Sequence, residues 1–234
     1  VFFESHWSET LEALLYYGNG SGADFIEIFL ENSDHLGVLA EQDKITSVSP
    51  AFGKGAGIRV FKGKRDGFVS TNDLSYTGLK QAIDQALGML GLDSNEKELN
   101  NFDGLLQLND FSTGKENWFN EIPGLNESCQ KLLEGTADLD KYGKYLNVRR
   151  ASYSRSLQEV IIAATDGTFA RDIRLHQTTG LNVLASDKDH RASIARRYGS
   201  SGKPNDLKEW NSDRSAQDIN ESTRKMLYAD YVEA

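Results

Sequence analysis

The chain has 234 residues, of which 38% are hydrophobic and 26% are charged, and its formal net charge at pH 7 is −9. This composition is typical of a globular protein, and the negative charge argues against a nucleic-acid partner because binding phosphates requires a basic surface. No window approaches the roughly 18 uncharged apolar residues of a membrane span, so we expect no membrane partner either.

The single cysteine, Cys129, excludes an internal disulfide and fits a reducing compartment. The chain begins with only three apolar residues, which is too short a run for a signal peptide. We therefore expect a cytoplasmic protein.

The first part of the chain predicts a helix followed by short strands. A helix is predicted over residues 8–17, and the regular alternation of apolar side chains predicts a strand over 24–31. The turn-prone residues 32–34 predict a break before a second strand near 36–41, and a third short strand is expected near 44–48.

A glycine-rich stretch, residues 52–57, then leads into a pair of strands. Strands over 58–61 and 68–71 are expected to be joined by a hairpin turn at 62–67. An apolar stripe at helical spacing predicts a helix over 75–90.

The second part of the chain repeats this order. A helix is predicted over 124–142, and a last helix is expected over 213–228 after a mobile loop at 199–205. Between them we expect five strands, near residues 145–154, 157–164, 168–178, 180–187 and 191–198.

Two turns are predicted within this second meander. Asp166–Gly167 lies between two apolar runs, which indicates a hairpin with a type I′ turn and positive φ at both residues. Gly180 is expected to mark another turn. Between the two turns, Phe169, Arg171 and Ile173 alternate onto one face of a strand.

Together these elements predict an α+β fold made of two helix–antiparallel meander–helix units. The repeated order indicates a weak internal duplication, with helices packed on one face of each sheet. The polar, weakly patterned residues 93–118 indicate a linker. We therefore expect an N-terminal domain over 1–92 and a second α+β domain over 119–234.

The glycine-rich stretch 52–57 is similar to a phosphate-binding loop only at first sight. It lacks the Gly-Lys-Ser/Thr ending of a P-loop and the third glycine of a dinucleotide fingerprint. It also precedes a predicted strand, whereas both motifs need a helix. We therefore expect close backbone packing at the start of a strand rather than a bound phosphate.

No catalytic or metal-binding site is predicted within the chain. Asp187, Asp189 and His190 lie at a hairpin tip, where Asp is an ordinary turn residue, and no two histidines have His-x-x-x-His spacing. Cys129 lies on an apolar helix face, which indicates a buried structural thiol. We expect no catalytic residue, no metal ligand and no cofactor here.

Arginines crowd the second meander of this acidic chain. Arg149 shares a predicted strand face with Ala151 and Tyr153, and Arg171 lies between two apolar residues of its strand. Arginine beside aromatic and aliphatic side chains is typical of interfaces, so Arg149, Arg171 and Arg174 are our candidates for binding a peptide or a partner. Alternatively, the arginines pair with carboxylates on neighbouring strands.

An ordered set of segments resembles the TldD branch of the TldD/PmbA family, whose members were once called modulators of DNA gyrase. The similarity runs from about residue 10 to the end of the chain, in the order of the family. The resembling segments are 22–31, 55–60, 67–71 and 79–90 in the first half, and 159–168, 172–174 and 196–199 in the second.

The resemblance implies a metallopeptidase, that is a hydrolase, in which a TldD chain pairs with a TldE/PmbA-type homologue. Such pairs are thought to cut unfolded or linear peptides at a zinc site made by a His-Glu-x-x-x-His helix and a later cysteine. That site lies in a region following the part present here, and this sequence contains no such motif.

The resemblance therefore implies the N-terminal, non-catalytic part of a TldD-like zinc peptidase. Zinc is expected in the intact family protein, and a homologous subunit or a second copy is expected as the partner in a dimer. The alternative is a stand-alone, non-enzymatic binding or assembly module. Whether the reading frame continues past Ala234 into a His-Glu-x-x-x-His segment distinguishes the two hypotheses.

Overall fold

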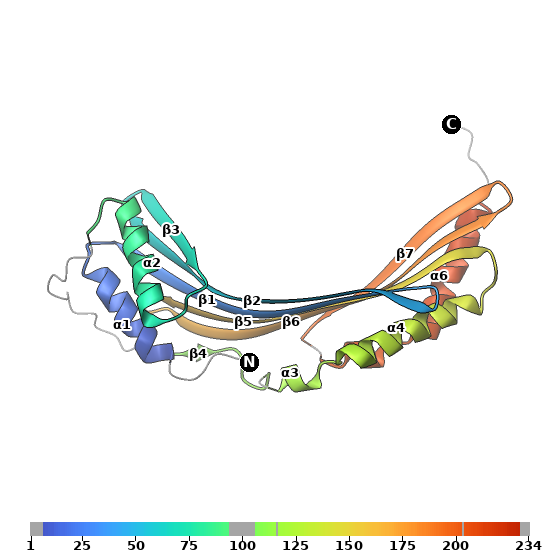
Figure 1. The fold of residues 1–234 in the computed structure, drawn as a ribbon, viewed down its shortest axis with the longest axis horizontal. Helices are drawn as coiled ribbons and strands as arrows, with labels where there is room; N and C mark the ends of the chain where they lie inside the picture. The colour runs from blue at the N-terminus through green and yellow to red at the C-terminus, as the bar shows by residue number, and fades with distance from the viewer. Residues whose placement is uncertain (1–6, 94–105, 116, 203, 230–234) are drawn as a thin grey trace. The chain divides into compact units, whose positions relative to one another are not determined.

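The computed structural model describes residues 7–93, 106–115, 117–202 and 204–229. Within these ranges the strands form a seven-stranded sheet in the order β3-β2-β1-β5-β6-β4, and β7 also pairs with β6 (Figure 1). Pairing is antiparallel except at β4, which lies parallel to β6. The strands are β1 (Phe25–Glu41), β2 (Lys44–Lys62), β3 (Arg65–Thr71), β4 (Asn109–Asp110), β5 (Leu146–Ala164), β6 (Phe169–Asp187) and β7 (His190–Ser201).

The chain divides into two compact units, each built from three segments of sequence. Strands β1, β2, β5 and β6 each contribute a segment to both units, so neither unit is continuous in sequence. Unit 1 comprises Val1–Ser33, Phe52–Glu116 and Gln158–Ile173, and unit 2 comprises Asp34–Ala51, Asn117–Leu157 and Arg174–Ala234.

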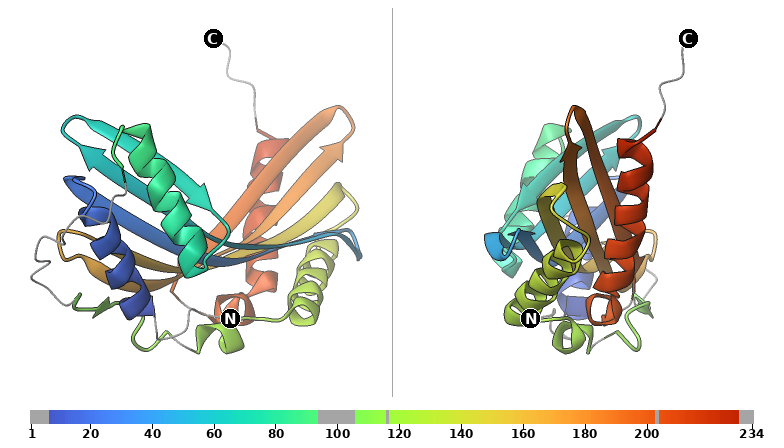
Figure 2. Two further views of the ribbon diagram at one scale, coloured as in Figure 1. Left: turned by 60° about the vertical axis from the view of Figure 1, so that its left-hand side comes forward. Right: turned by 90° about the vertical axis from the view of Figure 1, so that its right-hand side faces the viewer.

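In unit 1, helices α1 (Trp7–Asn19) and α2 (Tyr76–Met89) cover one face of the strands (Figures 1 and 2). The even-numbered residues of β1 and β2 point toward these helices, and Ile26, Ile28 and Ile58 are completely buried there. Because successive side chains of a strand point to opposite faces of the sheet, the odd-numbered side chains of β1 and β2 lie on the face without helices.

Strand β3 lies unusually close to helix α2. The Oγ of Ser75 accepts a hydrogen bond from the Gly78 N–H at 3.1 Å, which caps the start of α2. Opposite this helix, a Cβ atom on Gly67 of β3 would lie 2.5 Å from the carbonyl oxygen of Ala86. Only a residue without a side chain fits at this point.

In unit 2, the two long helices are α4 (Leu125–Asp140) and α6 (Ser212–Leu227). They pack on one another, and α6 also packs along β7, as the right-hand view of Figure 2 shows. Gly135 lets α4 approach the ring of Trp210, because a Cβ at this position would lie 2.8 Å from Cη2 of the indole. Two short helices, α3 (Trp118–Glu121) and α5 (Asp206–Glu209), precede the long ones.

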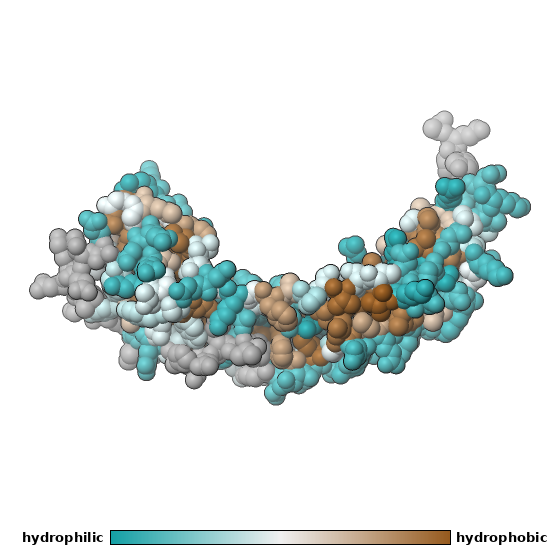
Figure 3. Space-filling view, viewed as in Figure 1, coloured by the Kyte–Doolittle hydropathy of each residue, from teal (hydrophilic) through white to brown (hydrophobic). Residues whose placement is uncertain are grey.

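Burial of the apolar side chains between helices and strands leaves mainly polar side chains on the surface. Figure 3 shows hydrophilic side chains over much of the visible surface of both units, interrupted by smaller apolar patches. None of the helices in the described ranges is long and apolar enough to cross a membrane.

The predicted fold class and order of elements are confirmed. The long elements follow the order helix, three strands, helix twice, as α1-β1-β2-β3-α2 and α4-β5-β6-β7-α6. The division into domains 1–92 and 119–234 stays a prediction. Half of the expected linker, 94–105 together with residue 116, lies outside the described residues, and β4 lies within the part that is described.

The predicted strand breaks are wrong, because the strands are longer than their turn-prone residues indicated. Strand β1 continues through residues 32–34, and its even-numbered side chains keep the same buried face before and after them. Gly180 lies in the middle of β6, opposite Arg197, and a Cβ there would lie 3.1 Å from the carbonyl oxygen of Arg196. Close packing, rather than a turn, explains this glycine.

Three further strand boundaries differ from the prediction. The expected strands near 44–48 and 58–61 are parts of one strand, β2, which also contains the glycine-rich stretch. The expected strands 145–154 and 157–164 are likewise one strand, β5. The first part of the expected loop at 199–205 is strand instead, because β7 continues to Ser201 through its ladder with β6.

The turn at Asp166–Gly167 exists, but it is not of type I′. Gly167 has the predicted positive φ, at 91°, whereas Asp166 is not among the described residues with positive φ. The Ala164 N–H donates to the Thr168 carbonyl at 2.8 Å and the Gly167 N–H donates to the Ala164 carbonyl at 3.1 Å. This pattern is that of a three-residue loop with a glycine bulge.

Candidate functional site

The glycine-rich stretch of β2 forms the floor of a surface hollow in unit 1. Gly53, Gly55 and Gly57 alternate along β2, so all three lie on the face without helices. The residues between them face the other way, and Ala56 and Ile58 are buried under the helices. Because the stretch is strand throughout and begins no helix, it lacks the geometry of the phosphate-binding motifs.

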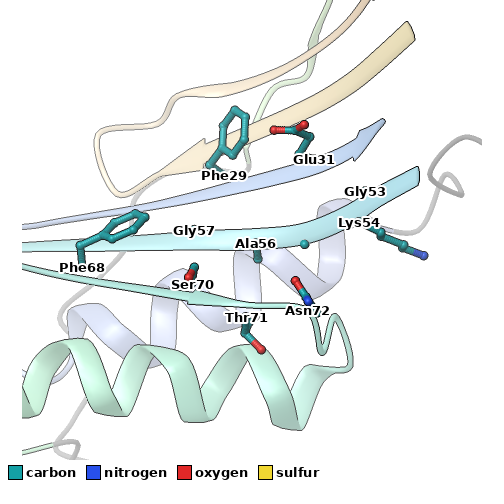
Figure 4. Close-up of a pocket in the computed structure, with 11 residues that line it drawn as sticks. Phe29, Glu31, Gly53, Lys54, Ala56, Gly57, Phe68, Ser70, Thr71 and Asn72 are labelled. Carbon is teal, nitrogen blue, oxygen red and sulfur yellow. The ribbon is translucent and has the colours of Figure 1, made fainter. Parts of the chain in front are cut away.

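We call this feature the glycine hollow. It has a volume of about 320 Å³. Figure 4 shows Phe29, Glu31 and Phe68 standing on the face away from α1 and α2, while Thr71 points toward α2. The hollow is lined by Phe29, Glu31, Gly53, Lys54, Gly55, Ala56, Gly57, Phe68, Ser70, Thr71 and Asn72.

The glycine hollow has the chemistry of a binding surface for an uncharged or weakly polar group. A Cβ on Gly57 would lie 3.1 Å from the Phe68 ring, so the glycine allows this ring to lie across the floor. Phe68 is 53% exposed, and the guanidinium of Arg59 lies 5.7 Å from its centroid. An apolar hollow with a few polar groups at its rim is the usual form of a ligand site.

No signal in the sequence identified this hollow beforehand. The sequence shows the three glycines, but their alternation over one face acquires meaning only when β1 and β3 supply the aromatic walls. The register that places Ser70 opposite Gly57 and Phe68 opposite Arg59 is a long-range property.

The described residues offer no set of ligands for a metal ion. Among them, no group of three or more His, Cys, Asp or Glu side chains comes together. Asp187 and His190 lie opposite one another at the β6–β7 turn, and Asp187 accepts a hydrogen bond from the Tyr228 hydroxyl at 2.8 Å. Cys129 is half-buried on α4 and packs against the core of unit 2. The residues described here therefore do not fit a zinc site.

The three candidate arginines are divided between the units. Arg171 lies in unit 1, and its Nη2 is 2.7 Å from Oε1 of Glu159, a side chain only 1% exposed. Its Nη1 lies 3.7 Å from Oδ2 of Asp110. Arg149, in unit 2, lies 3.1 Å from Oδ1 of Asp140, and Arg174 is exposed on β6.

Two of these arginines thus have carboxylate partners within their own unit. Burial favours the neutral form of Asp110, but hydrogen bonds from Ser112 and the charge of Arg171 outweigh burial and lower the pKa of this carboxyl. The pairs of Arg171 with Glu159 of β5 and Asp110 of β4 are cross-strand pairs, whereas Arg149 pairs with Asp140 of helix α4. The assignment of Arg149, Arg171 and Arg174 to peptide or partner binding stays a prediction.

The fold and these sites define an α+β protein whose helices cover one face of a mainly antiparallel sheet. Residues 26–90 match the profile of the PmbA/TldA metallopeptidase domain 1, and residues 124–227 match that of the PmbA/TldA metallopeptidase central domain. The chain therefore belongs to the PmbA/TldD family, as the resemblance of its segments predicted.

Solved structures share this fold. A proposed modulator of DNA gyrase from Thermotoga maritima is 12% identical, with a TM-score of 0.69 over 97% of this chain and 50% of that one. A second proposed modulator, from Bacteroides thetaiotaomicron, is 14% identical, with a TM-score of 0.66 over 99% and 52%. TldE from Thermococcus kodakarensis is 16% identical, with a TM-score of 0.57 over 90% and 47%. The chain spans about half the length of these relatives.

Proposed function

We propose that this chain is the non-catalytic part of a TldD-type metallopeptidase that acts on unfolded or linear peptides. One observation carries the proposal: the two matched segments correspond, in order, to domain 1 and the central domain of a metallopeptidase family. In this role the chain supplies a scaffold, a surface for a homologous TldE/PmbA-type subunit or a second copy, and part of the peptide cleft. The intact protein is expected to work in the cytoplasm.

Zinc would be bound by the part of the relatives that this chain does not cover. The described residues provide no ligand set, so no step of hydrolysis is assigned to them. Their contribution is to bind and orient the peptide, which raises the effective concentration of the scissile bond at a metal bound elsewhere.

The glycine hollow is the surface that we assign to the peptide in unit 1. Its glycine floor lets a peptide backbone approach closely, and Phe29 and Phe68 provide apolar walls for one side chain. Strand β3 pairs with β2 only from Ala56 onward, so Phe52–Gly55 has one neighbouring strand, β1, in the described sheet. An extended peptide placed beside this part of β2 would continue the line of β3 beyond its last residue, Thr71.

The test uses the intact protein encoded by the full reading frame, together with its homologous subunit. Cleavage of unstructured peptides is measured for the native protein and for Phe68→Ala. We expect Phe68→Ala to raise KM for peptide cleavage with little change in stability, because Phe68 lines the glycine hollow but is largely exposed. Met89→Ala is the matched control, since Met89 is also exposed and apolar but lies on helix α2.

Two results would contradict this proposal in different ways. Equal KM values for Phe68→Ala and Met89→Ala would remove the glycine hollow from the peptide cleft. A complete lack of metal-dependent cleavage by the intact pair would favour the alternative function, a non-enzymatic binding or assembly module.

A further inference from the structure

Unit 2 contains a small set of polar residues where its sheet should be apolar. The odd-numbered residues of β6 face the helices, and Leu175, Leu181 and Val183 are apolar and buried as that position requires. Gln177 and Thr179 share this face and are only 3% and 5% exposed. Because burying polar groups costs free energy, such an interruption of an apolar face needs a reason.

The neighbouring strand β7 continues the polar patch. Ser200 lies opposite Gln177, and Tyr198 lies opposite Thr179. The Oε1 of Gln177 accepts a hydrogen bond from the Tyr153 hydroxyl at 2.6 Å, which fixes the orientation of the amide. The Oγ of Ser200, in contrast, is buried without a hydrogen-bond partner among the described residues. An acceptor is therefore available inside the structure.

These residues surround a cavity of about 180 Å³, which we call the polar cup. The segment of α5 and the residue after it complete its wall with Asp206, Glu209 and Trp210. The indole Nε1–H of Trp210 donates to the Ser215 Oγ at 3.0 Å, so the ring has a fixed orientation. The polar cup is lined by Gln177, Thr179, Tyr198, Gly199, Ser200, Asp206, Glu209 and Trp210.

The lining is complementary to an organic cation. It contains two carboxylates, two aromatic rings and several hydroxyl or amide oxygens, and no Lys, Arg or His is among the described residues that line it. Burial raises the pKa of the nearby Tyr153 hydroxyl, the positive charge of Arg155 lowers it, and the negative charges of Asp206 and Glu127 raise it. The preference for a cation therefore follows from the two carboxylates of the lining, Asp206 and Glu209.

We propose that the polar cup binds the guanidinium group of an arginine side chain in an extended peptide. A guanidinium is planar and stacks on aromatic rings such as those of Tyr198 and Trp210, and its five N–H donors suit the carboxylate and hydroxyl acceptors of the cup. A lysine ammonium has fewer donors and no planar group to stack. The inference deepens the proposed function. It rests on that function only for the statement that the arginine belongs to a peptide.

The binding experiment needs no peptidase activity. The ¹⁵N-labelled 234-residue chain is titrated with N-acetyl-arginine N-methylamide, and the indole N–H signal of Trp210 is followed by NMR. We expect a saturable shift of this signal. We expect the neutral analogue N-acetyl-citrulline N-methylamide to leave the signal unchanged, and the corresponding lysine derivative to bind more weakly. Free arginine should also bind more weakly, because its α-carboxylate is repelled by Asp206 and Glu209.

Two variants and one matched control make the assignment specific. Glu209→Gln removes one carboxylate at an exposed position and should weaken binding roughly tenfold, the usual effect of losing a charge-assisted hydrogen bond. Glu221→Gln, at an exposed position on α6 in the same unit, is the matched control and should leave the affinity unchanged. Ser200→Ala should weaken binding without lowering the midpoint of urea unfolding, because the free protein loses a buried hydroxyl without a partner.

The inference is overturned by an unchanged Trp210 signal, by equal binding of the citrulline analogue, or by equal effects of Glu209→Gln and Glu221→Gln. Free arginine that binds as tightly as the capped residue would overturn the assignment to a peptide. In another outcome, the chain shows saturable binding with these specificities while the intact protein cleaves no peptide. That result would support the polar cup as an arginine site and would contradict only the proposed function.

Discussion

The close approach of β3 to helix α2 predicts that Gly67→Ala is strongly destabilising. A Cβ at Gly67 would lie 2.5 Å from the carbonyl oxygen of Ala86, about 0.9 Å less than the 3.4 Å at which ordinary contact begins. The obstacle is the backbone of the last turn of α2, so no side-chain rotation can relieve the contact. Either α2 or β3 must move within the packed core of unit 1.

The expected cost is that of overpacking a well-packed core, about 1–3 kcal/mol. For a protein of this size, each kcal/mol lowers the thermal midpoint by roughly 2–4 °C. Urea unfolding followed by circular dichroism measures the loss directly, with the midpoint as the observable.

Gly88→Ala is the matched control for this prediction. Gly88 lies on the exposed side of α2, and nothing lies within 4 Å of a Cβ built there. Removing a glycine from a helix interior should stabilise the protein by about 0.5–1 kcal/mol. If Gly67→Ala unfolds at the same urea concentration as the native chain, or shifts the midpoint upward as Gly88→Ala does, the close approach is not a real constraint.

Four other predictions concern charge, backbone conformation and association. Arg171→Ala should destabilise unit 1 by about 2–4 kcal/mol, because it removes the guanidinium beside buried Glu159; a urea midpoint within error of the native value would contradict this. The folded-state pKa of Asp110 is lowered, so its contribution to stability is present above its unfolded pKa and lost as the pH falls through the acidic range; Asp110→Asn should reduce that pH dependence, as measured by unfolding at several pH values. Gly167→Val should cost about 1–3 kcal/mol through strain at φ 91°, since no atom lies within 4 Å of an added Cβ, and an unchanged denaturation midpoint would refute it. Finally, sedimentation of the chain alone and with its homologue should show association that Arg149→Ala combined with Arg171→Ala weakens; a monomer in both cases, with only stability altered, would contradict the interface.

The order of the elements could be predicted because each long element carries a local pattern. The helical spacing of Leu79, Ile83 and Ala86 can be recognised within two turns of sequence. The alternation of Ile26 and Ile28 can likewise be recognised from residues two positions apart. These patterns survive in the folded chain because they match the faces that become buried. Local agreement of this kind is sufficient to predict the fold class.

The strand boundaries could not be predicted in the same way. Asn, Ser, Asp and Gly favour turns in isolated segments, but a neighbouring strand can keep them extended. Asp34 illustrates this, because its carboxylate lies 3.2 Å from the guanidinium of Arg155, and both side chains are nearly buried. That partner is more than 100 residues away in the sequence, so no local pattern reveals it.

The two candidate sites depend on register in the same way. The glycine hollow requires Phe29 on β1 to lie beside the glycines of β2, and the polar cup requires Gln177 to lie opposite Ser200. Only the polar cup leaves a trace in the sequence, since Gln177 and Thr179 interrupt an apolar strand face. The composition of either site could not be known before the pairing of the strands.

The sharing of strands between the two units has a consequence for how the chain could be divided. A break within residues 94–105 would leave β1, β2 and β3 in one fragment, and β5 and β6 in the other. In unit 1, the Ile26 N–H donates to the Thr165 Oγ1 at 3.0 Å and the Thr165 N–H donates to the Ile26 carbonyl at 3.0 Å, so each fragment supplies half of these bonds. In unit 2, the ion pair of Asp34 and Arg155 joins the same two fragments. The halves should therefore behave as complementing fragments, each exposing an unpaired strand edge alone and recovering native structure when mixed.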